Sequence, residues 1–269
     1  MPLITLTTDF GIEDEYVGIM KGVILSINPS AAIIDITHHV DPQDINQAAQ
    51  IIKSSYKYFP KGTIHVIVVD PGVGSNRAIL ALEMMGYFFI APDNGVLTHL
   101  MDEGDLAALV QVVNSKYFLK AVSQTFHGRD IFAPVAAHIS NGLKIQKLGA
   151  KTDKKNIVCL DIRKPSIIDN NTLIGAIMWI DHFGNLITDI DSKILSKFCD
   201  KEKKLEIRIG ANKIYGLSVN YESAGLQSPV AVIGSRGYLE IAINCGSAQY
   251  YFKAKKGDAV KVIRAKKRY

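Results

Sequence analysis

The stretch TIHVIVVDPGVGSNR, residues 63–77, sets the architecture of this chain. Its first part, residues 64–69, is a nearly unbroken β-branched run, which predicts a strand buried on both faces. The strand ends on Asp70, and a loop rich in Pro and Gly leads from there to Arg77. Ligands of open α/β sheets bind beyond the carboxyl ends of the strands, so Asp70 is a candidate site residue. Asp-Pro-Gly is also good turn chemistry, and from these residues alone a plain turn is an equal alternative.

Strand and helix patterns alternate in the residues before this stretch. Apolar strand patterns cover residues 3–7 and 32–36, and the second is expected to be a buried strand. Apolar residues at helical spacing cover residues 17–27 and 45–59. Strand, helix, strand, helix and strand with short connections predict a parallel sheet with right-handed crossovers. We therefore expect an α/β N-terminal domain that is Rossmann-like, with a mostly parallel sheet.

The rest of the first half adds a hairpin, a further strand and two helices. The hairpin is predicted for residues 79–82 and 87–91, around a Met-Gly turn. A short helix is expected to end at Met101, and a strand pattern covers residues 109–113. A longer amphipathic helix follows Asp130.

The character of the sequence changes over residues 151–171, which are charged and poorly periodic. This change predicts one domain over residues 1–160 and a second over residues 171–269. Many short strands with turns between them predict a smaller all-β, barrel-like second domain. Only residues 192–198 suggest a helix there. The expected strands are residues 172–180, 186–190, 205–209, 213–219, 229–233, 238–243 and 259–263.

The composition of the 269 residues, 48% hydrophobic and 21% charged, is typical of a soluble globular enzyme. The net charge of +5 owes much to a basic tail over residues 253–268, but no nucleic-acid reading surface accompanies it, so no nucleic acid is expected as a partner. The three scattered cysteines argue against a disulfide framework or a cysteine zinc site and for a reducing compartment. No signal peptide pattern or membrane-length apolar run is found. We expect a cytoplasmic protein with no membrane contact.

Polar residues gather where the elements of the first domain end. They are Asp9, His38, His39, Asp41, Asp70, Arg77, Asn94 and His127. A histidine beside an arginine and an aspartate can hold a water molecule and favour its hydroxide form, although a capping or core-edge histidine is an equal alternative for His127. The pair His38 and His39 lacks matching carboxylate or thiolate spacing, so a structural role is favoured over a metal site. No dinucleotide fingerprint, Walker motif or nucleophile elbow is present.

At these residues the chain resembles the S-adenosyl-L-methionine hydroxide adenosyltransferases, relatives of the bacterial fluorinase and chlorinase. The resemblance covers essentially the whole chain. Each motif alone is weak, but their shared order is specific. The motifs are TTDFG at 7–11, ITH at 36–38, DPGVG at 70–74 with the following Arg77, PDNG at 92–95, FHGRD at 126–130, IDHFGN at 180–185 and GSRGYLE at 234–240.

The resemblance implies hydrolysis of S-adenosylmethionine to adenosine and methionine, by attack of water on C5′ of the ribose. The family's catalytic triad falls on Asp70, Arg77 and His127. The sulfonium is a good leaving group, so no metal and no cofactor are expected, and S-adenosylmethionine is itself the substrate. Water is the weak partner, so the protein has to orient it and favour its hydroxide-like form.

Substrate contacts are implied in the same way. Asp9 matches the family's ribose-binding aspartate, and a carboxylate suits two neighbouring hydroxyl donors. Asp181 and Glu240 are expected to hold the methionine ammonium. Ser235 and Arg236 are expected to hold its carboxylate. For Glu240 and Arg236, an exposed strand charge is a nearly equal alternative.

The adenine is expected to meet the side chain of Asn185 and the backbone near Ile243 and Cys245. Members of the family form trimers, which implies a homotrimer. The site would then lie at a subunit interface, between the first domain of one chain and the second domain of its neighbour.

Three substitutions and one missing insertion separate the chain from its halogenating relatives. Gln43 replaces a tryptophan, Asp70 a tyrosine and Gly128 a serine, and no long insertion fits between residues 82 and 87. An acid at Asp70 would repel a halide, so water is the expected nucleophile. Two alternatives remain open: a module that binds S-adenosylmethionine or adenosine with incidental hydrolysis, and, less favoured, a halogenase.

Overall fold

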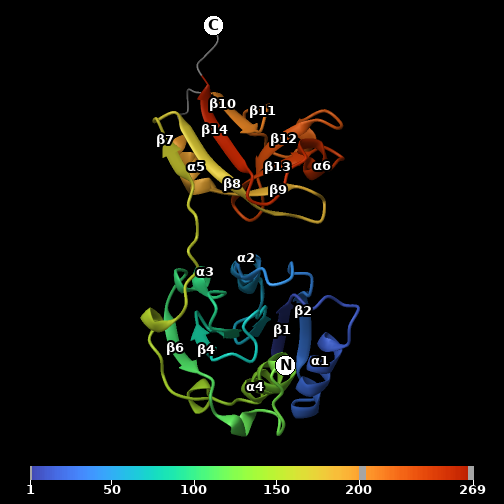
Figure 1. Ribbon diagram of the computed structural model, residues 1–269, viewed down its shortest axis with the longest axis vertical. Coiled ribbons are helices and arrows are strands. Elements are labelled where there is room, and N and C mark those ends of the chain that lie inside the picture. Colours follow the sequence, from blue (N-terminus) through green and yellow to red (C-terminus); the bar gives the residue numbers. More distant parts are fainter. Residues whose placement is uncertain (1, 200–203, 266–269) are drawn as a thin grey trace. The chain divides into compact units, whose positions relative to one another are not determined.

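The computed structural model describes residues 2–199 and 204–265, and the end of the basic tail, residues 266–268, lies outside the described residues (Figure 1). The chain divides into two compact units, residues 1–161 and residues 162–269. Each unit is built on its own sheet; the first unit has a hydrophobic core on each face of its sheet, and the second unit has a separate core.

The first unit is built on a six-stranded mixed sheet of order β2-β1-β3-β5-β4-β6. The strands β2, β1, β3 and β5 run parallel to one another, β4 is antiparallel to β5, and β6 is antiparallel to β4. Therefore β4 alone runs against the other strands of this sheet. The strands are β1 (Leu3–Thr8), β2 (Ala32–Thr37), β3 (Ile64–Val68), β4 (Ile79–Met84), β5 (Tyr87–Pro92) and β6 (Leu106–Gln111). The predicted hairpin is confirmed as β4 and β5, joined through Met85 and Gly86, which both have positive φ.

Helices cover both faces of this sheet. α1 (Tyr16–Ile27) packs against α4 (Ala133–Ser140) on one face, and α2 (Ile45–Ser55) and α3 (Thr98–Met101) contribute to the core on the other (Figure 1). The central strand β3 supplies Val66 to the first core and Ile67 to the second. The sequence-based prediction of a strand buried on both faces is confirmed. Shorter helical turns complete the unit at Tyr56–Tyr58, Ser115–Tyr117, Gly128–Phe132, Ile145–Lys147 and Lys154–Asn156.

Two strand predictions in the first unit are wrong in detail. β2 is an edge strand and not a buried one, because only β1 pairs with it; Ile34 is 43% exposed. Asp35, also exposed, forms an ion pair with Lys21 of α1. The strand expected at residues 109–113 is β6, which starts earlier and ends at Gln111.

The second unit contains an eight-stranded sheet in which every paired strand is antiparallel to its neighbour. Its order is β11-β10-β14-β8-β9-β13-β12, with β7 beside β8. A bridge from Ser218 to Val232 connects the chain just after β11 to β12, so the sheet is nearly closed and barrel-like. The elements are β7 (Ser166–Ile168), β8 (Thr172–Ile180), β9 (Leu186–Asp191), α5 (Ser192–Phe198), β10 (Lys204–Ile209), β11 (Asn212–Tyr215), β12 (Pro229–Ile233), β13 (Tyr238–Ile243), α6 (Ala248–Phe252) and β14 (Ala259–Ala265), with a short turn at Tyr221–Ser223.

The predicted strands of the second unit recur with three corrections. The strand expected at 213–219 ends at Tyr215, because Gly216 has a φ of +79°, which a strand does not allow. β7 lies in the stretch that was expected to be irregular, and α6 is a second helix where only α5 was expected. Within the described ranges no helix has the length and apolar character needed to span a bilayer.

Candidate active site

The loop after β3 folds back so that Arg77 meets Asp70. Two tight turns bend it, with Val73 N donating to Asp70 O and Ser75 N to Gly72 O. Arg77 Nε then donates to both carboxylate oxygens of Asp70, at 2.9 and 2.7 Å, and Nη2 donates to Oδ2. The two side chains are 10% and 4% exposed, respectively. Asp70 is therefore the partner of a nearly buried guanidinium and not only the start of a turn.

His127 completes a chain of contacts with this pair. Its Nδ1 lies 3.0 Å from Arg77 Nη2. A guanidinium only donates, so Nδ1 has to accept, and the ring is neutral with its proton on Nε2. Burial and the neighbouring Arg77 charge lower the pKa of His127, against the opposing effects of Asp70, Asp130 and the Ser123 backbone. His127 is consequently a hydrogen-bond donor at Nε2, and its Nδ1 is already occupied.

The segment around His127 is anchored by a buried carboxylate. Asp130 has no exposed surface and accepts hydrogen bonds from Ser123 N and Ser123 Oγ, both at 2.7 Å, and from Arg129. Burial disfavours its charge, but the Arg129 and Ser123 hydrogen bonds lower the pKa of Asp130 overall. A π-helical turn, Gly128–Phe132, follows His127 directly, and such turns occur frequently at functional sites.

Asp9, Asp70 and His127 line one cavity of about 430 Å³ in the first unit. Arg77 is not among the residues that line it, because its guanidinium lies behind the Asp70 carboxylate and the His127 ring. Asp9 follows β1 directly, and its Oδ2 accepts from Gln43 N at 2.8 Å. The structure thus brings together four of the polar residues predicted from the sequence.

Aromatic residues of this cavity were not predicted. Phe10, Tyr16 and Phe126 line it and pack on one another, with ring centroids 5.1 to 6.0 Å apart. Phe10 and Phe126 adjoin Asp9 and His127 in their motifs, which is a signal that could have identified them. Tyr16 opens α1 and carries no comparable signal.

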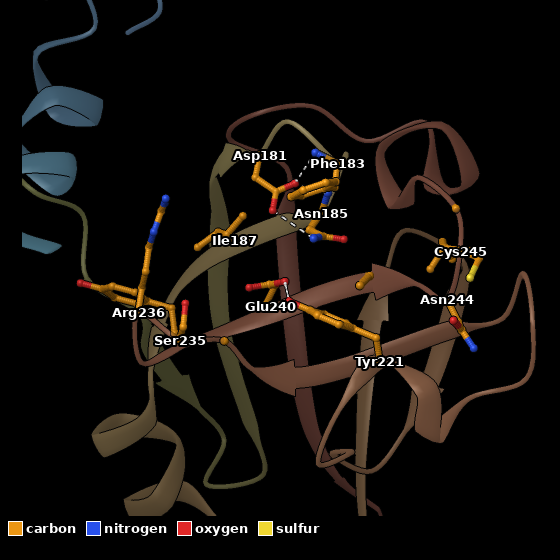
Figure 2. A pocket seen from close by; sticks show the side chains of 15 residues that line it. Asp181, Phe183, Asn185, Ile187, Tyr221, Ser235, Arg236, Glu240, Asn244 and Cys245 are labelled. Atoms are coloured by element: carbon orange, nitrogen blue, oxygen red, sulfur yellow. Dashed lines mark hydrogen bonds between the residues drawn. The ribbon is translucent and has the colours of Figure 1, made fainter. Parts of the chain in front are cut away.

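The other predicted contacts share a cavity of about 740 Å³ in the second unit (Figure 2). The predicted residues that line it are Asp181, Asn185, Ser235, Arg236, Glu240 and Ile243, and the predicted backbone contact near Cys245 lies there as well. They come from the β8–β9 turn, the β12–β13 turn and β13. Phe183 and Tyr221, which were not predicted, also line this cavity.

Asp181 organises the turn at one end of this cavity. Its Oδ1 accepts from the backbone N–H groups of Phe183 and Asn185, both at 2.9 Å, and its Oδ2 accepts from Asn185 Nδ2 at 3.0 Å (Figure 2). Gly184 is needed in the turn because its φ is +81° and a Cβ there would lie 2.1 Å from Ser247 Oγ. The Asn185 amide is consequently fixed, and among the residues that the structure describes nothing donates a hydrogen bond to its side-chain oxygen, which can accept one from a ligand.

Glu240 is a buried carboxylate on β13, 8% exposed, and not an exposed strand charge. Tyr221 OH donates to its Oε1 at 2.5 Å. Burial, together with the hydrogen bond and charge of Glu240 and the charge of Asp181, raises the pKa of Tyr221 to about 12. Tyr221 therefore keeps its proton and donates a hydrogen bond to Glu240. The cavity holds two carboxylates, Asp181 and Glu240, which favour a cationic ligand group.

Arg236 and Ser235 lie at the exposed rim, in the turn between β12 and β13. The Arg236 side chain extends away from Glu240 in Figure 2, and its guanidinium carbon lies 5.0 Å from the centre of the Trp179 ring. A stacked guanidinium keeps its in-plane donors free for a carboxylate.

Two of the four remaining predicted polar residues, His38 and Asn94, have structural partners. His38 is buried against Thr8, and Asn94 Nδ2 donates to Val69 O at 2.9 Å, where it fixes the end of β3. Among the residues that the structure describes, no three His, Cys, Asp or Glu side chains are grouped as a metal site.

The profile of the SAM hydroxide adenosyltransferase N-terminal domain matches residues 4–149, and that of the C-terminal domain matches residues 175–261. The chain belongs to the SAM hydroxide adenosyltransferase family. The resemblance found in the sequence motifs is confirmed.

Individual relatives support the same family. A (R)-S-adenosyl-L-methionine hydrolase of Thermus thermophilus is 33% identical over 95% of this chain and 97% of its own. A fluorinase of an Actinoplanes species is 30% identical over 98% of each chain. A crystal structure of an uncharacterized conserved protein from Thermotoga maritima superposes with a TM-score of 0.89, at 36% identity over 97% of this chain and all of that chain.

Proposed function

We propose that the protein hydrolyses S-adenosyl-L-methionine to adenosine and L-methionine. The observation that carries this proposal is the contact chain Asp70–Arg77–His127 at a cavity, in a chain similar over its full length to S-adenosylmethionine hydrolases. In the reaction a water oxygen bonds to C5′ of the ribose while the C5′–S bond breaks. The sulfur keeps the electron pair, so the sulfonium leaves as the neutral thioether of methionine, and the water loses one proton.

Asp70 is the proposed acceptor of that proton. Its carboxylate lines the cavity and has lone pairs beyond those that Arg77 occupies. Arg77 supplies a fixed positive charge that favours a hydroxide-like water. His127 is not a base in this scheme, because its Nδ1 accepts a hydrogen bond from Arg77. Its neutral ring holds the Arg77 guanidinium in place. Hydroxide and sulfonium cancel each other's charge as they meet, so a dry cavity should accelerate the step.

The substrate contacts divide between the two units. Asp9 of the first unit is proposed to bind the ribose hydroxyls. The fold of the first unit is proposed to be Rossmann-like. In the second unit, Asp181 and Glu240 would bind the methionine ammonium. Ser235 and Arg236 would bind the carboxylate, and Asn185 with the backbone near Ile243 the adenine. Support comes from the cavity that these second-unit residues share and from its two carboxylates.

We further propose that the protein is a homotrimer whose substrate site is shared between neighbouring subunits. A mixing experiment tests this: Asp70→Asn and Asp181→Asn proteins, each inactive alone, should regain activity when they are unfolded and refolded together. Light scattering should give the mass of three chains. A monomeric mass, or no recovery in the mixture, would count against a shared site. Metal independence and a cytoplasmic location remain predictions.

The test of the main proposal uses heavy-oxygen water. Purified protein incubated with the (R) sulfonium epimer, the one named in the relatives, should release methionine and adenosine with heavy oxygen at the 5′ position. Asp70→Asn is the matched inactive control. Halogenated adenosine formed at high chloride or fluoride would support a halogenase instead. Tight binding of substrate without any product over hours would support a binding module.

A further inference from the structure

A buried pair, Thr8 and His38, lies beneath the loop that carries Asp9. Thr8 is the last residue of β1 and has no exposed surface, and His38 follows β2 and is 4% exposed. Thr8 Oγ1 lies 2.8 Å from His38 Nδ1. Neither side chain reaches the cavity, so neither can touch a ligand there.

The hydrogen bonds of this pair have one consistent direction. Phe10 N donates to Thr8 Oγ1 at 3.2 Å, which leaves the Thr8 hydroxyl hydrogen to donate to His38 Nδ1. His38 is then neutral, with its proton on Nε2. That nitrogen lies 3.1 Å from Asp35 Oδ1, although its N–H does not point straight at the oxygen. Asp35 in turn binds Lys21 at 2.6 Å.

Backbone bonds join the two loops above this pair. Gly11 N donates to His38 O at 2.8 Å, and Val40 N donates to Thr8 O at 3.3 Å. At the top, Gln43 N donates to Asp9 Oδ2, with Gln43 held at a φ of +66°, a conformation that non-glycine residues seldom adopt. The direction of the Asp9 carboxylate therefore depends on how the loop after β1 sits on the loop after β2.

We propose that His38 and Thr8 are positioning residues for ligand binding, which fix the loop that presents Asp9 and Phe10 to the cavity. This inference rests on the proposed function of Asp9. A neutral acceptor at His38 Nδ1 is the required feature, since it orients the Thr8 hydroxyl and through it the Phe10 amide. A role in ligand affinity, and not in the chemical step, follows because the pair leads to Asp9 and not to Asp70.

The test compares two substitutions at each position. His38→Asn keeps an acceptor near the place of Nδ1, whereas His38→Leu removes it; Thr8→Ser keeps the hydroxyl, whereas Thr8→Val removes it. Adenosine affinity measured by calorimetry should fall about tenfold in His38→Leu and Thr8→Val, as expected for one lost buried hydrogen bond to a positioned group. His38→Asn and Thr8→Ser should recover most of it. His39→Asn, in the exposed neighbour, is the control for altering this loop.

Two further measurements separate positioning from simple loss of stability. The single-turnover rate at saturating S-adenosylmethionine should change less than twofold in His38→Leu, about as small an effect as independent sites show. The double variant Asp9→Asn, His38→Leu should lose less affinity than the product of the two single fold-losses. The reason is that both substitutions act on the same contact, the one between Asp9 and the ligand. Multiplicative losses, or unchanged affinity with only a lower melting temperature, would overturn the inference. If the wild-type protein binds neither ligand, the proposed function fails as well.

Discussion

Arg77 is the residue whose removal best separates chemistry from binding. Its guanidinium lies behind Asp70 and His127, so it stabilises charge in the cavity without lining it. Arg77→Ala should lower the single-turnover rate by about two to three powers of ten, as removal of one preorganised electrostatic contact does. Substrate affinity should barely change. Asp70→Asn should behave similarly with the fold intact.

Asp9→Ala is the complementary variant, since it should chiefly weaken binding. Single-turnover kinetics over a range of substrate concentrations separates the two effects. If Asp9→Ala slows the chemical step while Arg77→Ala weakens only binding, the assigned roles are reversed.

His127 provides a test of which residue accepts the proton of the attacking water. Its pKa is lowered, mainly by burial and by the Arg77 charge, so the ring stays neutral below the pH at which a free histidine charges. The profile of kcat/KM against pH should therefore show no loss of activity at about pH 6.5. His127→Asn keeps an acceptor for Arg77 and should retain more activity than His127→Leu. An acid limb near the ordinary histidine pKa that disappears in His127→Asn would make His127 the base.

At this scale the sequence predicted charged and polar residues better than aromatic ones. Asp70, Arg77 and His127 stand in short motifs at strand and helix ends, where parallel topology brings them together. Tyr16 and Tyr221 lie outside such motifs, and their positions depend on how α1 and the loop before β12 pack. That packing is a tertiary property that no local pattern encodes.

Among the loops, the one after β3 depends on Gly74. This residue has a φ of +77°, and a Cβ there would lie 2.3 Å from Gln124 O, in the segment that leads to His127. Gly74→Ala should therefore displace that segment and lower the turnover rate by up to about 100-fold, since small misplacements of catalytic groups are costly.

Gly62→Ala is the matched control for this variant. Gly62 has a similar φ of +86° but open space around its Cβ position. The Gly62→Ala protein should lose about 1 kcal/mol of unfolding free energy and should keep its full activity. Equal activity of the two variants in a steady-state assay would show that the contact with Gln124 is unimportant.

Elements were predictable where a local pattern was complete. β3, β8 and α5 follow from β-branched runs or helical spacing bounded by turn residues. β2 was placed correctly but judged buried, because its apolar run reads the same at the edge of a sheet as at the centre. Only the strand order, a long-range property, distinguishes the two.

The stability of the whole molecule should depend on pH through a buried histidine of β3. His65 has no exposed surface, it stacks on Phe89, and its burial lowers its pKa to about 3. At this residue the unfolded chain takes up a proton at about pH 6.5 and the folded chain does not. The contribution of His65 to the free energy of unfolding is therefore fully present above that pH and is lost as the pH decreases. Between about pH 7 and pH 5 the protonation of this residue alone should lower the free energy of unfolding by roughly 2 kcal/mol.

Denaturant titration of the wild-type protein and His65→Asn at both pH values measures this effect. The variant should lose less stability on acidification, while His182→Asn, at an exposed histidine, should behave as the wild type does. His99, whose pKa is lowered to about 4, acts in the same direction, so part of the dependence should persist. An unchanged acid sensitivity in His65→Asn would contradict the argument.

The two borders of the first sheet differ in a way that bears on solubility during expression. At the β6 edge a later segment of the chain pairs with the strand, with Gln111 N donating to Ala150 O and Val113 N to Leu148 O. Outside β2 the described residues place no further strand, and the run Ile33-Ile34-Asp35-Ile36 carries a single charge. We therefore expect Asp35 to oppose self-association through this edge strand. The Asp35→Val protein should aggregate when it is concentrated, as measured by light scattering, whereas the Asp35→Glu protein should not.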